Sequence, residues 1–143
     1  MAKNWIVVAE SSRARLFAME NPRTALREVE DFSHPEGRMP AHELKSDRTA
    51  RVFRGRGRER HPVEPNVDPK RQEAINFASQ IADRLDLARA QGEFEGVVLI
   101  APPEFLGLLR DALSTTTAKC VVKSIDKNLV QLSESEIREK LAG

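Results

Sequence analysis

The sequence predicts an α/β domain built on a mixed β-sheet with helices on both faces. The first observation is a continuous apolar run at residues 97–100, Val-Val-Leu-Ile, which is typical of a parallel strand that helices cover on both sides. The second is the segment directly after this run, where two prolines end the strand and apolar side chains return at helical spacing with Phe105, Leu109 and Leu113. The third is a set of three short strand-like segments at the start of the chain.

Those three segments are expected to form an antiparallel meander. Residues 4–10 (NWIVVAE) and 13–19 (RARLFAM) flank a two-serine turn, and the second segment alternates between two faces as a hairpin strand does. Residues 25–32 follow an Asn-Pro turn and are more polar. We therefore expect this third strand at an edge of the sheet, where its charges discourage pairing with another chain.

A long helix should open the second half of the chain. Asp68 is suited to its N-cap and Pro69 to its first turn. An apolar stripe runs from Ala74 to Ala88, and Gly92 marks the end of the helix. The buried strand at residues 97–100 and the second helix come next.

Two further elements complete the predicted fold. Residues 119–126 indicate another strand, more polar and so nearer an edge, and Ser133 with Glu136 has the spacing of a capping box at the start of a short last helix. The predicted order is β-β-β-α-β-α-β-α, with a mixed five-stranded sheet, three main helices and right-handed crossovers between parallel strands. The whole chain, residues 1–143, then forms one domain.

The composition is that of a single globular domain. The chain has 143 residues, 40% of them hydrophobic and 31% charged, with a formal net charge of +1, so an anionic partner would have to meet a local patch. Its one cysteine, Cys120, excludes an internal disulfide and a cysteine-rich metal site, and the apolar run around it favours a buried thiol. The first residues resemble neither a signal peptide nor a membrane span, so we expect a cytoplasmic protein.

The segment 33–69 differs from the rest of the chain. Hydrophobic periodicity stops there, five prolines and three glycines are scattered along it, and it holds all three histidines, His34, His42 and His61. A stretch of this length without periodic structure is uncommon inside a compact domain and is usually functional or disordered. The histidines lack the short spacings of a zinc motif, so we expect exposed loop residues and no bound metal.

The candidate functional residues are arginines in this segment. They are Arg51, Arg54, Arg56, Arg58 and Arg60. With one glutamate among them, the local charge is about +4 by count. Arginines pair phosphate oxygens bidentately, and the neighbouring glycines let a backbone approach, which favours contact with RNA. A solvated stretch that maintains solubility and a contact with a protein partner are the alternatives. Phe53 is the only aromatic residue of the stretch, so a base-stacking platform is not well supported.

Catalytic constellations are not visible in the sequence. A ribonuclease-H-type nuclease needs several carboxylates around divalent metal ions; Glu10 could supply one, but the central strand ends in Ala101 where another would be expected. Asp83 and Asp86 are expected on the solvated face of the long helix. No glycine-rich nucleotide fingerprint is present, so we expect neither catalysis nor a cofactor.

Three local features complete the set of candidates. Ser11, Ser12 and Arg13 could bind an anion in the first turn, although a plain turn is the simpler interpretation. Residues 114–117 are predicted to be a helix exit and a loop. Gly107 interrupts the second helix at a cost of about 1 kcal/mol relative to alanine, for which close packing of that helix on the sheet is the simplest explanation.

The predicted order of elements matches the ribonuclease-H-like arrangement and its relative, the middle domain of archaeal and eukaryotic class-1 peptide release factors. More specifically, the chain resembles the host attachment family, bacterial proteins described as required for attachment to host cells. The resemblance runs over nearly the whole chain. It rests on WIVVAESSRARLF, on NFASQIADRLDLARAQGEFEGVVLIAPPEFLGLLRDAL and on the ending KSIDKNLVQLSESEIREKL.

The resemblance also bears on function. In the release factors, the loop between the third strand and the first helix carries a Gly-Gly-Gln motif that enters the peptidyl-transferase centre, and the corresponding segment 33–69 has no such motif. We therefore expect a non-catalytic protein that contacts RNA or a ribosomal surface through residues 51–60. The alternative is a protein–protein interaction factor that supports attachment to host cells, and a hydrolase or nuclease is the third interpretation.

Overall fold

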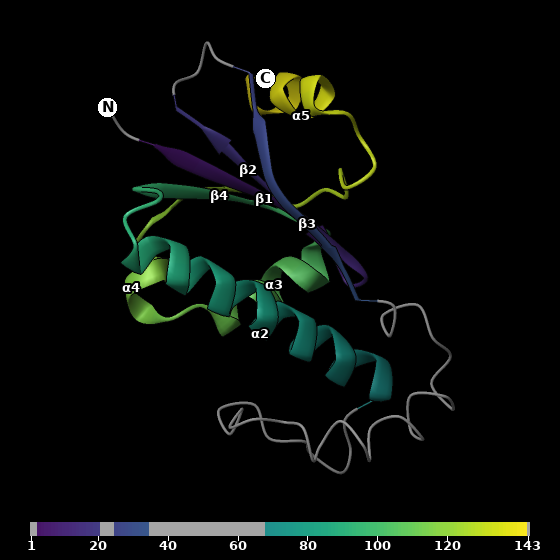
Figure 1. The fold of residues 1–143 in the computed structure, drawn as a ribbon. Helices are drawn as coiled ribbons and strands as arrows, with labels where there is room; N and C mark the ends of the chain where they lie inside the picture. Colours follow the sequence, from purple (N-terminus) through teal and green to yellow (C-terminus); the bar gives the residue numbers. More distant parts are fainter. Residues whose placement is uncertain (1–2, 21–24, 35–67, 143) are drawn as a thin grey trace.

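The computed structural model describes residues 3–20, 25–34 and 68–142. The elements in these ranges are β1 (Asn4–Glu10), β2 (Arg13–Met19), β3 (Arg27–Ser33), α2 (Pro69–Ala90), β4 (Gly96–Ile100), α3 (Pro103–Ala112), α4 (Thr115–Ala118), β5 (Val121–Ile125) and α5 (Glu134–Ala142) (Figure 1).

The five strands form one mixed sheet in the order β3-β2-β1-β4-β5. The β1–β2 and β2–β3 pairs are antiparallel, and β4 lies parallel to both β1 and β5. The mixed sheet, the polar edge position of β3 and the parallel central position of β4 confirm the predictions. Because β2 alone runs in the opposite direction, the carboxyl ends of β1, β3, β4 and β5 meet at one end of the sheet, which we call the carboxyl edge.

The central strands are buried on both faces. All five residues of β4 are buried, as are the five inner residues of β1. Successive side chains of a strand point to opposite faces, so Trp5 and Val7 enter one apolar cluster while Ile6 and Val8 enter another. The β-branched residues expected to suit a doubly covered strand therefore supply both clusters.

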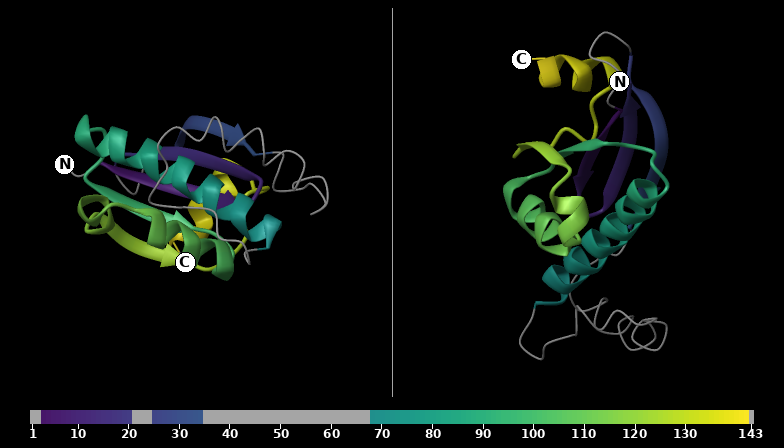
Figure 2. Two further views of the ribbon diagram at one scale, coloured as in Figure 1. Left: turned by 90° about the horizontal axis from the view of Figure 1, so that it is seen from below. Right: turned by 90° about the vertical axis from the view of Figure 1, so that its left-hand side faces the viewer.

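One face of the sheet is covered by α2 and α3 (Figures 1 and 2). The Asp68 side chain caps α2 by accepting from the Lys70 N–H at 3.1 Å, and the helix packs Phe77, Ile81 and Leu85 against the sheet. Gly92 follows with φ of +74°, a conformation that glycine adopts without a Cβ penalty. The predicted N-cap and terminating glycine are both confirmed.

The other face is covered by the end of the chain (Figure 2). Leu129, Val130 and Ile137 of α5 and the loop before it are buried against Ile6 and Phe17 of the sheet. The Ser133–Glu136 capping box forms as predicted, with reciprocal bonds of 2.9 and 3.2 Å. Helices on both faces are thus confirmed.

Several local predictions need correction. The third strand begins and ends slightly later than expected, at Arg27–Ser33, so Ser33 belongs to the sheet. Residues 115–118 form the short helix α4 instead of a loop, because the Ser114 hydroxyl caps it by accepting from the Thr117 N–H. Cys120 is partly exposed, since it lies just before the edge strand β5.

Gly107 does not mark close packing of α3 on the sheet. It lies on the exposed side of the helix, and a Cβ placed there would meet no atom within 4 Å. The explanation predicted from the sequence is therefore wrong, and the helix carries the cost of a glycine without a contact that requires one.

Replacing Gly107 with alanine should raise the free energy of unfolding by about 0.5–1 kcal/mol, because alanine loses less backbone entropy in a helix and finds open space. Gly92→Ala is the matched control, since a Cβ there also meets nothing within 4 Å but φ is +74°. We expect Gly92→Ala to destabilise the protein. Urea unfolding of both variants measures the difference, and a stabilising Gly92→Ala would contradict the role of φ.

Candidate functional site

The five candidate arginines, Arg51, Arg54, Arg56, Arg58 and Arg60, lie outside the described residues, as do His42 and His61. The described chain stops at His34 and resumes at Asp68. These two residues mark where the arginine-bearing segment 35–67 joins the fold. The described part of the candidate site is therefore this junction.

The junction lies at the carboxyl edge of the sheet. β3 ends there at Ser33, and α2 starts at Pro69 beside it. The backbone N–H of His34 donates to the carbonyl oxygen of Ser12, in the turn between β1 and β2, at 2.8 Å. In open α/β sheets this edge is where ligands bind, because loops from several strands converge there.

His34 forms a buried pair with Glu73 in the first turns of α2. Its Nε2 lies 3.0 Å from Glu73 Oε1, and the two residues are 4% and 0% exposed. The imidazole stacks on Phe77, with ring centroids 4.9 Å apart and planes 13° from parallel. The expectation of an exposed loop histidine is thus wrong for His34, because β3 continues far enough to bring it under the helix.

The first turn at this edge is held by its own side chains. Ser12 donates to Glu10 Oε1 through both its backbone N–H, at 2.5 Å, and its hydroxyl, at 2.7 Å. Glu10, which was considered as a nuclease carboxylate at the end of the first strand, is therefore a turn acceptor. Within residues 3–20, 25–34 and 68–142, no group of three or more His, Cys, Asp or Glu is placed to hold a metal ion.

A second network joins α2 to α4. Asp86 Oδ1 accepts from the hydroxyls of Ser114, at 2.9 Å, and Thr117, at 2.5 Å, while Arg89 Nε donates to the same Thr117 oxygen at 2.9 Å. The sequence predicted that Asp86 lies on the solvated face of the helix, and these bonds correct that prediction. Its carboxylate holds the short helix in place.

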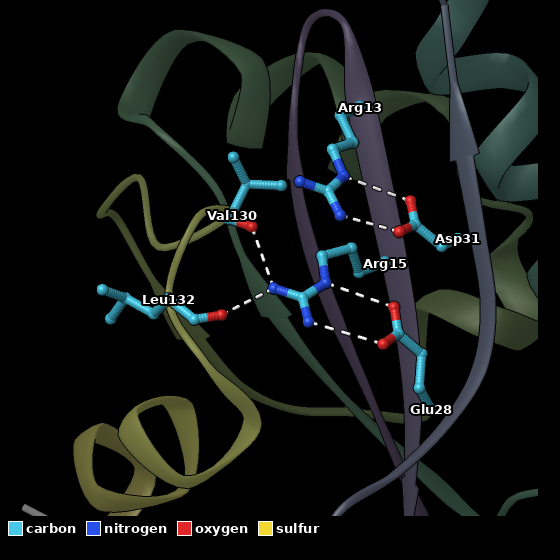
Figure 3. A network of polar contacts seen from close by, with 6 residues as sticks. All are labelled: Arg13, Arg15, Glu28, Asp31, Val130 and Leu132. Carbon is cyan, nitrogen blue, oxygen red and sulfur yellow. Dashed lines mark hydrogen bonds and ion pairs between the residues drawn. The ribbon is translucent and has the colours of Figure 1, made fainter.

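Two arginines of β2 face acids of β3 (Figure 3). Arg13 bonds both oxygens of Asp31, at 2.7 and 3.2 Å, and this hydrogen bonding lowers the pKa of Asp31 and raises that of Arg13. The Arg13 and Asp31 side chains are 34% and 41% exposed, so solvent screens the pair.

Arg15, two residues along the same strand, is only 8% exposed. Its Nη1 donates to the carbonyl oxygens of Val130, at 3.0 Å, and Leu132, at 2.6 Å, and its Nε lies 3.2 Å from Glu28 (Figure 3). The guanidinium carbon also lies 5.0 Å from the centroid of the Phe17 ring. Sequence alternation placed Arg13, Arg15 and Phe17 on one face. Arginines beside apolar side chains were the available signal of a buried contact, but this signal did not distinguish Arg15 from Arg13.

Breaking the His34–Glu73 pair should destabilise the fold. We expect His34→Ala to lower the free energy of unfolding by about 2–3 kcal/mol, through lost stacking on Phe77 and a buried carboxyl group deprived of this partner. A double-mutant cycle with Glu73→Gln, measured by urea unfolding, gives the coupling between the two side chains. Additive effects of the two single changes would contradict a direct interaction.

The Arg13–Asp31 pair predicts a pH-dependent contribution. Because the pKa of Asp31 is lowered in the folded state, its stabilisation is present above the unfolded-state pKa, near 4, and is lost as pH falls through the lower folded value. Asp31→Asn should cost about 0.5 kcal/mol near neutral pH, and less as pH falls below about 4. Urea unfolding between neutral and acidic pH tests this, and a cost that grows on acidification would refute it.

Comparison with known proteins adds three findings. The chain matches, over residues 5–141, the family described as "Protein required for attachment to host cells". Two solved structures are similar in fold. One, titled "Archaeal protein", has 10% sequence identity and a TM-score of 0.49, and the match covers 96% of this chain and 35% of that chain. The other, the archaeal translation termination factor aRF1, has 10% identity and a TM-score of 0.47, and the match covers 98% of this chain and 38% of that chain. The chain thus spans little more than a third of these structures' length.

No curated protein matched the chain. Among the described helices, none combines the length and the apolar character needed to cross a membrane. The family match covers nearly all of the chain, from β1 to α5. The chain therefore belongs to the family of proteins required for attachment to host cells.

Proposed function

We propose that this protein works by contact and not by catalysis, and that it binds RNA, free or on a ribosomal surface, through Arg51, Arg54, Arg56, Arg58 and Arg60. The observation that carries the proposal is the concentration of charge. A chain whose formal net charge is +1 places five arginines and one glutamate within residues 51–60. The rest of the chain must therefore be slightly acidic by count.

The chemistry of this stretch suits a phosphate backbone. Guanidinium groups form paired hydrogen bonds with phosphate oxygens, and Gly55 and Gly57 between them leave room for close approach. Binding that neutralises phosphates releases counterions, so its affinity falls with salt. A cytoplasmic location, where RNA and ribosomes are found, belongs to the same proposal.

The junction supports the proposal through its position. His34 and Glu73 lie on opposite sides of the gap in the described chain and are 3.0 Å apart, at the carboxyl edge. A segment joined to the fold at this edge starts where α/β domains commonly present ligand-binding loops. The scaffold beneath it is held by buried contacts, which favours a rigid base for the arginine stretch.

A second candidate function follows from the family. Its description points to a role in attachment to host cells, which a protein–protein contact could serve. The same arginines would then meet an acidic protein surface. RNA remains the leading proposal because five closely spaced guanidinium groups match the repeating charge of a phosphate backbone.

Replacing Arg54, Arg56 and Arg58 with alanine should weaken binding of a labelled single-stranded RNA oligonucleotide. It should also reduce the slope of log affinity against log salt by about 2, because each phosphate contact on a single strand contributes about 0.7. Fluorescence anisotropy over a series of salt concentrations measures both quantities.

A charge-matched variant controls for net charge. Arg27→Ala, Arg110→Ala and Lys119→Ala together remove the same charge from exposed positions elsewhere on the fold, and should leave the slope nearly unchanged. Equal losses in the two triple variants would show general attraction and overturn the assignment to residues 51–60. Lack of RNA binding by the unaltered protein would overturn the proposal altogether and leave the protein-partner alternative.

A further inference from the structure

The last part of the chain, residues 126–142, lies across the second face of the sheet as a strap (Figure 1). Its buried residues are Leu129, Val130 and Ile137, and most of its other side chains are exposed. Beneath it lies an apolar sheet face. That face consists of Ile6, Val8, Phe17, Val98 and Ile100, all 5% exposed or less.

Much of the strap's hydrogen bonding lies within the strap itself. Leu132 N–H donates to the Leu129 carbonyl at 3.1 Å, and Val130 N–H to the Asn128 side chain at 3.3 Å. The capping box of Ser133 and Glu136 stabilises the start of α5 in the same way. These bonds shape the strap and do not fasten it to the sheet.

Arg15 supplies polar bonds that cross from the sheet to the strap. Its Nη1 donates to the Val130 and Leu132 carbonyls, on either side of Gln131, while Nε and Nη2 engage Glu28 of β3 at 3.2 and 3.4 Å (Figure 3). At the far end of the strap, Lys123 Nζ lies 3.5 Å from the Leu141 carbonyl, a long and exposed contact. The two carbonyl bonds of Arg15 are thus shorter and less exposed than this contact.

We propose that the strap is a conformational device that opens as a local unit, with Arg15 as its latch. Opening breaks the two carbonyl bonds of Arg15 and withdraws the three buried side chains together with the partly buried Leu132 and Leu141, while α2 and α3 keep the first apolar cluster intact on the other face. The opened form exposes the apolar sheet face. Segments held by few buried contacts open at lower free energy than the core.

Hydrogen–deuterium exchange of the full chain, followed by mass spectrometry of its peptides, tests the proposal. In the unaltered protein, amides of residues 129–141 should exchange faster, and with weaker dependence on low urea concentrations, than amides of α2 and β4. Arg15→Met, which keeps an apolar stem without donors, should accelerate exchange at residues 129–141 by roughly 10- to 100-fold, the range expected for lost hydrogen bonds to a charged group.

Arg13→Met is the matched control. Arg13 lies on the same face of β2 and pairs with a β3 acid in the same way, but bonds to Asp31 and to neither strap carbonyl. It should leave exchange of the strap unchanged. If the strap amides of the unaltered protein exchange at the same rate and with the same urea dependence as the amides of α2 and β4, the proposal is overturned. This outcome is decisive even if Arg15→Met fails to fold. Equal acceleration of strap and core amides in Arg15→Met would also overturn it.

Discussion

Burial of β1 and β4 on both faces is the constraint on which the rest of the structure depends. All five residues of β4 and the five inner residues of β1 are buried, and their side chains alternate between two apolar clusters. Burying one valine, leucine or isoleucine side chain contributes about 1.5–3 kcal/mol, so leaving either face in water would cost as much as the whole stability margin of a typical domain. Each face therefore needs cover from a different part of the chain.

The two faces are covered in different ways, and this explains where the polar networks lie. The first is covered by regular helices, whose backbone groups are satisfied internally, and Asp86 only has to hold the short helix α4 beside them. The second is covered partly by irregular chain around Val130, whose carbonyl oxygens need donors from elsewhere. Arg15 supplies them from the sheet, and the Glu28 carboxylate of the neighbouring strand balances its charge. A charged side chain on an apolar face is thus a consequence of covering that face with a loop.

The same sheet directs the functional proposal to one end of the molecule. Four strands end at the carboxyl edge, where the β1–β2 turn is tied by Ser12 and Glu10 and where His34 lies buried against Glu73 and Phe77. The arginine stretch joins the fold between these fixed points. Membership of the host attachment family describes a requirement and names no reaction, and contact through a charged segment on a rigid base is consistent with that description.

The sequence by itself determined the sheet, the helices α2, α3 and α5 and the order of these elements, because apolar periodicity and the capping residues Asp68, Ser133 and Gly92 are local properties. It also showed that positive charge is concentrated in residues 51–60. What only the tertiary structure decided is which polar side chains are buried, since that depends on partners distant in the chain: Arg15 meets carbonyls more than a hundred residues away, and His34 meets Glu73 across the arginine-bearing segment. Local patterns carry no information about such tertiary contacts. For that reason His34 was predicted to be exposed but is buried, Asp86 was predicted to be solvated but accepts two hydrogen bonds, and Gly107 was predicted to be closely packed but faces open space.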